Sequence, residues 1–537
     1  MINTYNYFVY HPVSIILLAA FVLLFIRKSI VICNIIIIIT MIISGYILYY
    51  LPTENTFRLF GIAVSYSGSI PNKIISIAFL IALFAANINS IANNRYYEMI
   101  CGSLYGACTI TCVLAADFIS MFVALELMVV FATIIIFMGG RKESFLSAKK
   151  YFITHLLSSN MILITIIHIF LISQSFEIIQ IGEIFRQTQY SITILLIGLS
   201  GLLINVAIFP FSGWMINYYP TATSSGFVYL ISFTTKLSIM LIFKLFAGCE
   251  LLKYAGIIMI IYASIKVIIE KDNMRILCYF SIISMGVMLI AFSTSNSELH
   301  DFAIYYLFIS ILAILVMSLA CSLLINATKT SLISISGFIT GLVALLAVPG
   351  TFSFTLKDMI SRYFESDRLV LWLMSFSIFI IGFAFPWKKL FYEKKLSISD
   401  YNINFSAQLM IVVICLITIL CLVFGGRMLG IASTLYNGNS LKQIIIILSS
   451  IFLAFVVRYR RFITKPISLL ELLGNIIFSL HKYKTKINLA SSEETILLSN
   501  IGLQCRKFFG EFHNQQTAIA VIFMLLTALL FTLMILF

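Results

Sequence analysis

Residues 117–138, DFISMFVALELMVVFATIIIFM, decide the fold class of this chain. The run is long enough to cross a bilayer as one α-helix, and beyond Asp117 at its start its only charged residue is Glu126. Apolar runs of similar length recur along all 537 residues, of which 61% are hydrophobic and 10% charged, with a mean hydropathy of +1.07. Soluble domains carry about 25% charged residues. The composition therefore excludes a water-soluble enzyme and a disordered protein, and it predicts an all-α polytopic membrane protein.

Hydropathy predicts about sixteen membrane-spanning helices. The expected ranges are 11–26, 30–51, 70–91, 97–115, 117–138, 149–173, 191–210, 221–247, 251–269, 274–294, 302–326, 332–363 (interrupted), 369–385, 405–424, 439–457 and 517–537.

The distribution of Lys and Arg between successive loops predicts the orientation of these helices. With the N-terminus outside, basic residues gather in the loops that face inward, among them Arg27, Lys28, Arg95, Arg141 and Lys142. The same bias continues along the chain, so the sixteen-helix count places both termini on the outer face of a cell (inner) membrane. The net charge of +14 is explained by this bias. No basic stripe interleaved with aromatic residues suggests a nucleic-acid partner.

The apolar runs cover most of the chain. We expect helices in 1–96, in 97–385 and in 386–457, and a final helix in 517–537. The one long polar stretch, 458–516, is basic and includes an amphipathic pattern. It is either a solvated cytoplasmic loop that touches anionic lipid or a docking element for a partner subunit.

Three charged residues fall inside predicted spans, where a charge costs at least about 2.5–3.5 kcal/mol. Glu126 lies in the fifth span, Lys236 in the eighth, and Lys357 follows the interruption in the twelfth. Buried groups that can bind and release a proton suit a proton relay. The alternative is a set of static ion pairs that fix helix packing, although two lysines outnumber one acid. Lys244 and Lys266 lie near helix ends, where they can reach the interface.

Two spans contain helix breakers. Pro210 ends the seventh apolar run, with Ser212 close by, and Pro349-Gly350 interrupts the twelfth. Irregular backbone at membrane depth is expected where it is buried or lines a cavity, so these breaks predict an ion pathway; ordinary proline kinks are the alternative.

The remaining polar groups carry less information. His155 and His168 in the sixth span are read either as packed core histidines, the interpretation we favour, or as relay members. The ten cysteines are scattered and show no ligand spacing, which favours packing roles over a metal site or disulfides. We find no sequence motif for a flavin, a nucleotide, an iron–sulfur cluster or any other cofactor, and no redox or hydrolytic centre is expected in this chain.

Several motifs in residues 100–380 together resemble the antiporter-like membrane subunits shared by respiratory complex I and Mrp-type cation/proton antiporters. The matching segments are Ala124-Leu125-Glu126-Leu127-Met128, Lys149-Lys150-Tyr151-Phe152, Pro210-Phe211 with Trp214, Lys236 between Thr235 and Leu237, Asp272 with Arg275 and Met285-Gly286, and Pro349-Gly350-Thr351 with Lys357. The resemblance implies two inverted five-helix repeats, in 97–250 and 251–385, and a relay of buried Glu and Lys.

The chain departs from the family pattern in its seventh helix. Asn205 stands where the family keeps a lysine that pairs with the fifth-helix glutamate, and Ser212 replaces the histidine of the PFHxW segment. Glu126 thus loses its expected partner; Asn205 can hydrogen-bond a carboxylate or hold a water but cannot carry charge.

The resemblance suggests three functions. The first is a proton-translocating subunit of a multisubunit cation (Na+)/proton antiporter of the Mrp type. The second is a proton-pumping membrane-arm subunit of NADH:quinone oxidoreductase. The third is a non-conducting structural paralogue, which Asn205 motivates. Other hydrophobic membrane subunits, protons and Na+, and anionic lipid are the expected partners.

Overall fold

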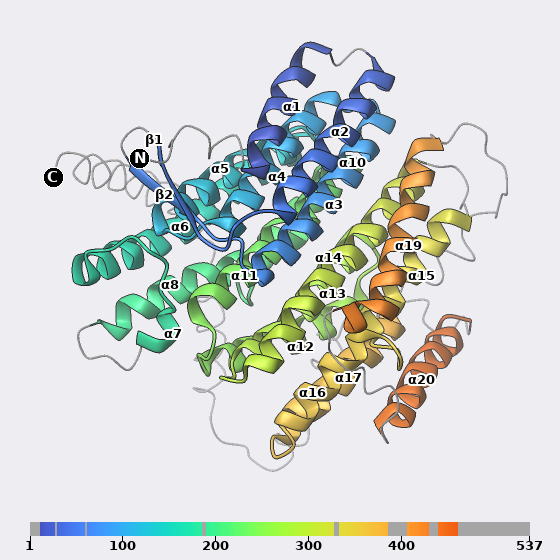
Figure 1. The fold of residues 1–537 in the computed structure, drawn as a ribbon. Helices are drawn as coiled ribbons and strands as arrows, with labels where there is room; N and C mark the ends of the chain where they lie inside the picture. Colours follow the sequence, from blue (N-terminus) through green and yellow to red (C-terminus); the bar gives the residue numbers. More distant parts are fainter. Residues whose placement is uncertain are drawn as a thin grey trace, which may run out of the picture. The chain divides into compact units, whose positions relative to one another are not determined.

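The computed structural model describes residues 11–26, 29–59, 62–184, 190–326, 332–384, 405–428 and 439–459. The chain up to Ala454 forms one compact unit. That unit is almost entirely helical in its described part, with one short hairpin (Figure 1).

Helices occupy nearly every predicted span. Their bounds are α1 Pro12–Ile26, α2 Ile30–Tyr49, α3 Ile70–Ala92, α4 Tyr96–Leu114, α5 Phe118–Phe137, α6 Lys142–Ser173, α7 Ile181–Ile184, α8 Ile192–Asn205, α9 Gly213–Tyr218, η1 Tyr219–Thr221, α10 Ser224–Ser232, α11 Thr234–Phe246, α12 Leu251–Ile269, α13 Asn273–Phe292, α14 Ser297–Asn326, α15 Leu332–Leu346, α16 Phe352–Tyr363, α17 Arg368–Ala384, α19 Phe405–Met428 and α20 Asn439–Tyr459.

The predicted fold class is confirmed. Ten helices in the described part of the chain are long and apolar enough to cross a membrane. Five of the predicted spans instead contain shorter apolar helices. The segment 458–516 lies outside the described residues except for its first two, and the predicted span 517–537 lies wholly outside them.

Two predicted helix starts were wrong. The sixth predicted span begins at 149, yet α6 begins at Lys142, and the eleventh begins at 302, yet α14 begins at Ser297. Each additional turn contains an acidic residue, Glu143 or Glu298, and a carboxylate is favourable at the positive end of a helix. A prediction from hydropathy alone leaves such turns out of the membrane span because they are polar.

A β-hairpin between α2 and α3 was not predicted. Strands β1 (Asn55–Leu59) and β2 (Ile62–Tyr66) pair antiparallel. The carboxylate of Asp117 accepts the backbone N–H of Ser65 at 2.7 Å, and it also accepts the N–H of Ser120 at 2.6 Å. Asp117 therefore caps α5 and fixes the end of the hairpin with the same side chain.

Both predicted helix breaks are present, and their backbones are alike. After α8 ends, Ala207 has φ +65°, and after α15 ends, Ala347 has φ +55°. A left-handed residue cannot continue a right-handed helix, so the chain leaves each helix before Pro210 or Pro349. The break before Pro210 or Pro349 falls in the fourth of five helices in each group, since α4, α5, α6, α8/α9 and α10/α11 are followed by α12, α13, α14, α15/α16 and α17. The fifth helix differs, because α10/α11 is interrupted at Phe233 and α17 is continuous.

Helix α14 connects the two five-helix groups. It packs against α3 and α10 on one side and against α13, α15, α16 and α19 on others, and it runs through the middle of Figure 1. Its sequence is apolar on every face, as expected for a helix buried all round. In contrast, α1 and α2 expose wide apolar faces. Such faces suit lipid or another membrane subunit.

Candidate functional site

Asn205 is the last residue of α8, directly before the first helix break. Its Oδ1 accepts a hydrogen bond from Ser158 Oγ at 2.7 Å and lies 2.8 Å from Nδ1 of His155. Both partners belong to α6. The sequence suggested that Asn205 could bond to Glu126; the structure instead gives its oxygen to His155 and Ser158.

His155 lies inside a cluster of aromatic rings. Its imidazole centroid is 4.2 Å from the ring of Tyr151 and 4.5 Å from that of Trp214. The indole N–H of Trp214 donates to the carbonyl of Ile204 at 2.9 Å, which holds the irregular segment after α8 against the helix end. His155 and Tyr151 are completely buried. This cluster fills the space next to the break.

Glu126 projects from α5 and is only half-buried. Its carboxyl interacts with the hydroxyl of Ser159 on α6, the residue directly after Ser158. Its neighbours Val123 and Leu127 are exposed, so Glu126 lies at the border between the α5–α6 contact and the outer surface of the chain.

Lys236 lies just after a kink that sequence analysis did not predict. Helices α10 and α11 meet at Phe233, which has φ −108° and ψ −70°. The kink leaves the carbonyl of Ile231 without its usual helical partner, and Nζ of Lys236 donates to that oxygen at 2.7 Å. Nζ also donates to the hydroxyl of Ser281 on α13. Lys236 is completely buried.

Thr234 joins the region of Lys236 to the aromatic cluster. Its hydroxyl lies 3.4 Å from the phenol oxygen of Tyr151 and hydrogen-bonds the phenol of Tyr105 on α4. The backbone N–H of Thr234 donates to Tyr105 at 3.1 Å. Hydroxyl groups can both donate and accept, so this chain of contacts can pass a proton between the two regions.

Lys357 repeats the arrangement of Lys236 in the second five-helix group. It lies on α16, beyond the break that contains Pro349 and Gly350, and its Nζ donates to the carbonyl of Leu345 in the last turn of α15 at 3.1 Å. It is completely buried. In both groups a broken helix therefore offers a free carbonyl that a buried lysine occupies.

Neither lysine is paired with a carboxylate among the residues that the structure describes. Asp358, next to Lys357 in sequence, forms its ion pair with Arg362 at 2.6 Å. The alternative of static ion pairs that join Glu126, Lys236 and Lys357 thus finds no such pair among the described residues. Helix α13 packs against both α11 and α16, so it lies between the two lysine sites.

A polar cavity of about 450 Å³ lies at the end of the bundle that the charge distribution predicts to be cytoplasmic. Arg95, Arg141, Thr223 and Ser225 are among its lining residues. Glu98 of α4 is buried beside it and accepts hydrogen bonds from Thr223 at 2.7 Å and Ser225 at 2.5 Å. Its other oxygen, Oε1, has no partner in the described structure.

Sequence analysis missed Glu98. Glu98 stands at the second residue of a predicted span, where an acid is usually exposed, and only its burial reveals it. Lys244 is half-buried, and its Nζ donates to the carbonyls of Val113 and Ala115, where it neutralises the negative end of α4. Lys266, in contrast, is exposed.

The other predicted pathway residues divide into two sets. Ser212 is buried, and its hydroxyl has no protein partner in the described chain. Pro349 and Gly350 are half-buried, whereas Pro210 is exposed. Pro210 therefore ends α8 without lining a buried route.

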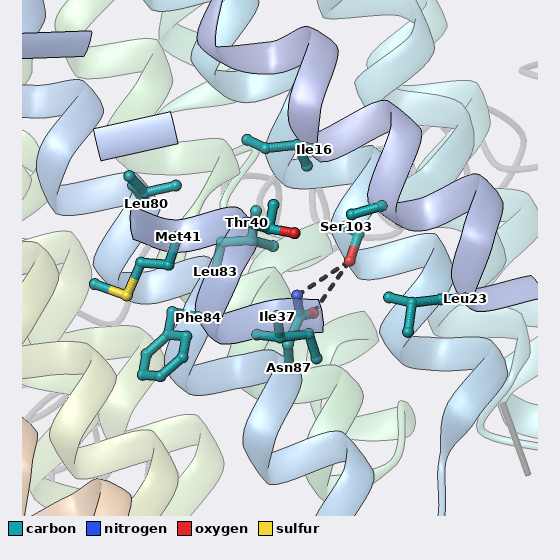
Figure 2. A pocket seen from close by; sticks show the side chains of 11 residues that line it. Ile16, Leu23, Ile37, Thr40, Met41, Leu80, Leu83, Phe84, Asn87 and Ser103 are labelled. Atoms are coloured by element: carbon teal, nitrogen blue, oxygen red, sulfur yellow. Dashed lines mark hydrogen bonds between the residues drawn. The ribbon is translucent and has the colours of Figure 1, made fainter. Parts of the chain in front are cut away.

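A second pocket lies between α1, α2, α3 and α4 (Figure 2). It is apolar except near the pair formed by Asn87 and Ser103, which are hydrogen-bonded at 3.1 Å, and near Thr40. Its volume of about 20 Å³ has room for one water molecule but not for an organic cofactor. No group of His, Cys, Asp and Glu within the described ranges could hold a metal ion.

Comparison with known proteins shows that part of the chain matches a protein family. The family described as "NADH:quinone oxidoreductase/Mrp antiporter, TM" matches residues 115–382, about half of the chain and the part that contains Glu126, Lys236 and Lys357. The chain belongs to this family.

Two curated relatives are similar to this family member over part of their length. The NADH-quinone oxidoreductase subunit N of Buchnera aphidicola is 26% identical over 325 residues, which are 54% of this chain and 65% of the relative. The NADH-ubiquinone oxidoreductase chain 2 of Dictyostelium discoideum is 26% identical over 235 residues, 40% of this chain and 47% of the relative. The chain thus spans about half to two thirds of these relatives.

A solved structure shares the family fold. A chain in the structure of the Mrp complex from Dietzia sp. DQ12-45-1b superposes with a TM-score of 0.66 at 14% identity, covering 81% of this chain and 98% of that one. At that identity the likeness establishes the fold, so the predicted membrane architecture is confirmed. The family match and the apolar helices together show a multi-pass membrane protein of the antiporter-like kind.

Proposed function

We propose that this chain translocates protons as a membrane subunit of a multisubunit cation (Na+)/proton antiporter of the Mrp type. The observation that carries the proposal is the pair of buried lysines, each bound to a carbonyl at a helix break and neither paired with a carboxylate in the described structure. Burying an unpaired ammonium costs several kcal/mol, and an apolar side chain would pack such a site more stably. Losing the proton removes that cost, so both lysines are suited to bind and release one.

The proposed relay runs from Glu126 through α6 to Lys236 and then to Lys357. Ser159 contacts Glu126, and Tyr151 and Thr234 lead to Lys236. Several buried hydroxyls beside this route, including those of Ser212 and Thr235, have no protein partner in the described chain. Internal water commonly satisfies such groups and would complete the steps that side chains do not span.

The cavity at the predicted cytoplasmic end is a second proposed entrance, which joins this relay at Thr234. Glu98 lies beneath its lining and on the same face of α4 as Gly102 and Tyr105, because residues three and four apart share a face. A Cβ on Gly102 would meet the ring of Tyr229 at 2.3 Å, so glycine allows close packing there. A proton that reaches Glu98 would thus be on the face of α4 that also carries Tyr105, the partner of Thr234.

A second candidate is a membrane-arm subunit of a proton-pumping NADH:quinone oxidoreductase. The observation that favours it is that both curated relatives are named as subunits of that enzyme. A relay of buried lysines suits either assembly. A non-conducting paralogue is the third candidate, because Asn205 cannot carry charge.

Two measurements test the proposal. The tagged chain is isolated with its partners from native membranes: small hydrophobic partners alone support the antiporter, and flavin and iron–sulfur subunits support the respiratory complex. The isolated assembly is then reconstituted in vesicles with Lys357→Met, and proton flux is measured against Lys266→Gln, which removes an exposed lysine. We expect flux to be lost only with Lys357→Met; equal flux in both variants would contradict the relay.

A further inference from the structure

The seventh helix of this chain has Asn205 where the family keeps a lysine, and the structure shows which side chain lies against it. Nδ1 of His155, from α6, is 2.8 Å from Oδ1 of Asn205. We propose that His155 takes the place of the missing lysine and carries the proton between Glu126 and Lys236. This inference rests on the proposed function, since it names a further member of the same relay.

The hydrogen bonds of Asn205 fix the tautomer of His155. The amide oxygen of Asn205 faces Nδ1 of His155 and can only accept, which assigns the shared proton to Nδ1. Oγ of Ser158 lies 2.7 Å from the same oxygen and 2.8 Å from the carbonyl oxygen of Gly201, so its single proton is shared between two acceptors. Nε2 of His155 then bears a lone pair, and it is buried without a hydrogen-bond partner in the described structure. The basic atom of the ring is therefore free to receive a proton.

His155 is packed between two aromatic rings. The ring centroids of Tyr151 and Trp214 lie 4.2 and 4.5 Å from the imidazole centroid, the first ring tilted and the second at an interplanar angle of 75°. The titratable side chains of this cluster are Tyr151 on α6 itself and Tyr219 from η1, and the carboxyl of Glu126 from α5 interacts with Ser159 one turn further along α6. No described residue forms an ion pair with His155, so its protonation changes the local charge directly.

His155 also has the right position along the relay. Tyr151, His155 and Ser159 are four residues apart and share one face of α6. Ser159 contacts Glu126 at one end of this row, and its hydroxyl donates to the backbone carbonyl of His155 at 2.6 Å. Tyr151 at the other end faces Thr234 at 3.4 Å, two residues before Lys236.

The proposed step is a simple proton transfer. A proton from the Glu126 side binds the lone pair of Nε2 and forms an imidazolium, while the Nδ1–H bond to Asn205 is kept. The same Nε2–H bond then breaks, and the proton passes toward Tyr151, Thr234 and Lys236. Imidazole returns to its neutral form with no other bond made or broken.

The test uses the complete assembly, isolated through the tagged chain and reconstituted in vesicles with a pH-sensitive dye. His155→Gln should reduce proton flux at least tenfold while the membrane level stays normal. The matched control is His168→Gln in the same helix, because Nε2 of His168 only accepts the backbone N–H of Ser191 at 2.9 Å. Its flux should equal the parent's.

Rescue separates a proton carrier from a packing residue. If His155 replaces a lysine, Asn205→Lys added to His155→Gln should restore at least a third of the parent flux. Flux within twofold of the parent in His155→Gln, or no rescue in the double variant, would overturn the inference. If Lys236→Met abolishes flux while His155→Gln does not, only this inference fails; if neither variant changes flux, the proposed function fails as well.

A second pair of variants applies if His155→Gln does not accumulate. Asn205→Leu keeps the imidazole but removes its acceptor, whereas Asn205→Asp keeps an acceptor at the same place. We expect Asn205→Leu to reduce flux several-fold and Asn205→Asp to retain it. Equal flux in these two variants would overturn the assignment of Asn205 as the residue that positions His155.

Discussion

Replacing Lys236 with methionine separates the transport role of this lysine from any structural role. Lys236 is completely buried between α10, α11 and α13, and its Nζ binds the carbonyl of Ile231 and the hydroxyl of Ser281. Methionine has a similar length and is flexible enough to fill the same space, but it cannot bind a proton.

The effect of Lys236→Met on stability should be small. Hydrogen bonds from a charged donor contribute about 1.5–3 kcal/mol each, so the two bonds contribute about 3–6 kcal/mol. Burying the ammonium costs several kcal/mol, which nearly cancels that gain because no carboxylate compensates it. We therefore expect the free energy of unfolding to change by less than about 2 kcal/mol. Proton transfer, in contrast, should slow by about 100-fold or more, the usual contribution of a positioned acid or base.

The assay combines thermal unfolding of the purified assembly with dye-monitored proton flux in vesicles. Lys266→Gln is the control, because it removes a lysine that is exposed on α12. Flux within twofold of the parent in Lys236→Met would refute the reasoning. Loss of the folded chain would show instead that Lys236 stabilises the fold by more than its two hydrogen bonds.

Four other predictions concern the same structure. Glu126→Gln should abolish cation-dependent proton flux in vesicles while leaving the membrane level near normal. Glu98→Gln should reduce flux about tenfold, because the amide cannot release a proton below the cavity. Ala347→Gly should stabilise the chain by about 0.5–1 kcal/mol in thermal unfolding, since glycine adopts positive φ without steric cost. Partial burial acts to raise the pKa of the Asp367 carboxyl, but hydrogen bonds from Lys253 and the backbone N–H of Val370 lower this pKa below its usual value. Asp367→Asn should therefore lower stability by up to about 1 kcal/mol at neutral pH, and the difference should disappear as the pH falls below about 4.

Each of these predictions has a contrary outcome. Glu143→Gln on the exposed first turn of α6 is the control for the two acidic variants, and an equal effect on flux would contradict them. Ala344→Gly, in the last turn of α15, should destabilise the helix by up to about 1 kcal/mol. A similar loss with Ala347→Gly would show that its positive φ is not strained. A constant effect of Asp367→Asn from pH 7 to pH 3 would show that its charge is not responsible.

The helices and the helix breaks could be predicted from the sequence because their signals are local. Apolar runs of bilayer length gave the spans, and Pro210 and Pro349-Gly350 marked both breaks. The kink at Phe233 was missed because residues 231–235 contain neither proline nor glycine. Side chains replace the helical hydrogen bonds at this kink. The hydroxyl of Tyr105 from α4 accepts the backbone N–H of Thr234, and Nζ of Lys236 donates to the carbonyl of Ile231.

The candidate site could be predicted only in part. A charge inside an apolar run is visible in the sequence, so Glu126, Lys236 and Lys357 were found. The contact between His155 and Asn205 joins residues 50 positions apart on two helices, and no spacing rule predicts it. The presence of Asn205 in place of a lysine could be read from the sequence. The side chain that lies against it, His155, can be identified only from the packing of α6 against α8.

Charge movement in the unaltered assembly tests proton translocation most directly. The isolated complex is reconstituted on a supported membrane, and the current that follows a jump in pH is recorded with and without Na+. If the buried lysines relay protons, a current should follow the jump in the parent and be absent with Lys236→Met. The absence of any pH-driven current in an intact parent assembly would contradict the account and favour a structural paralogue.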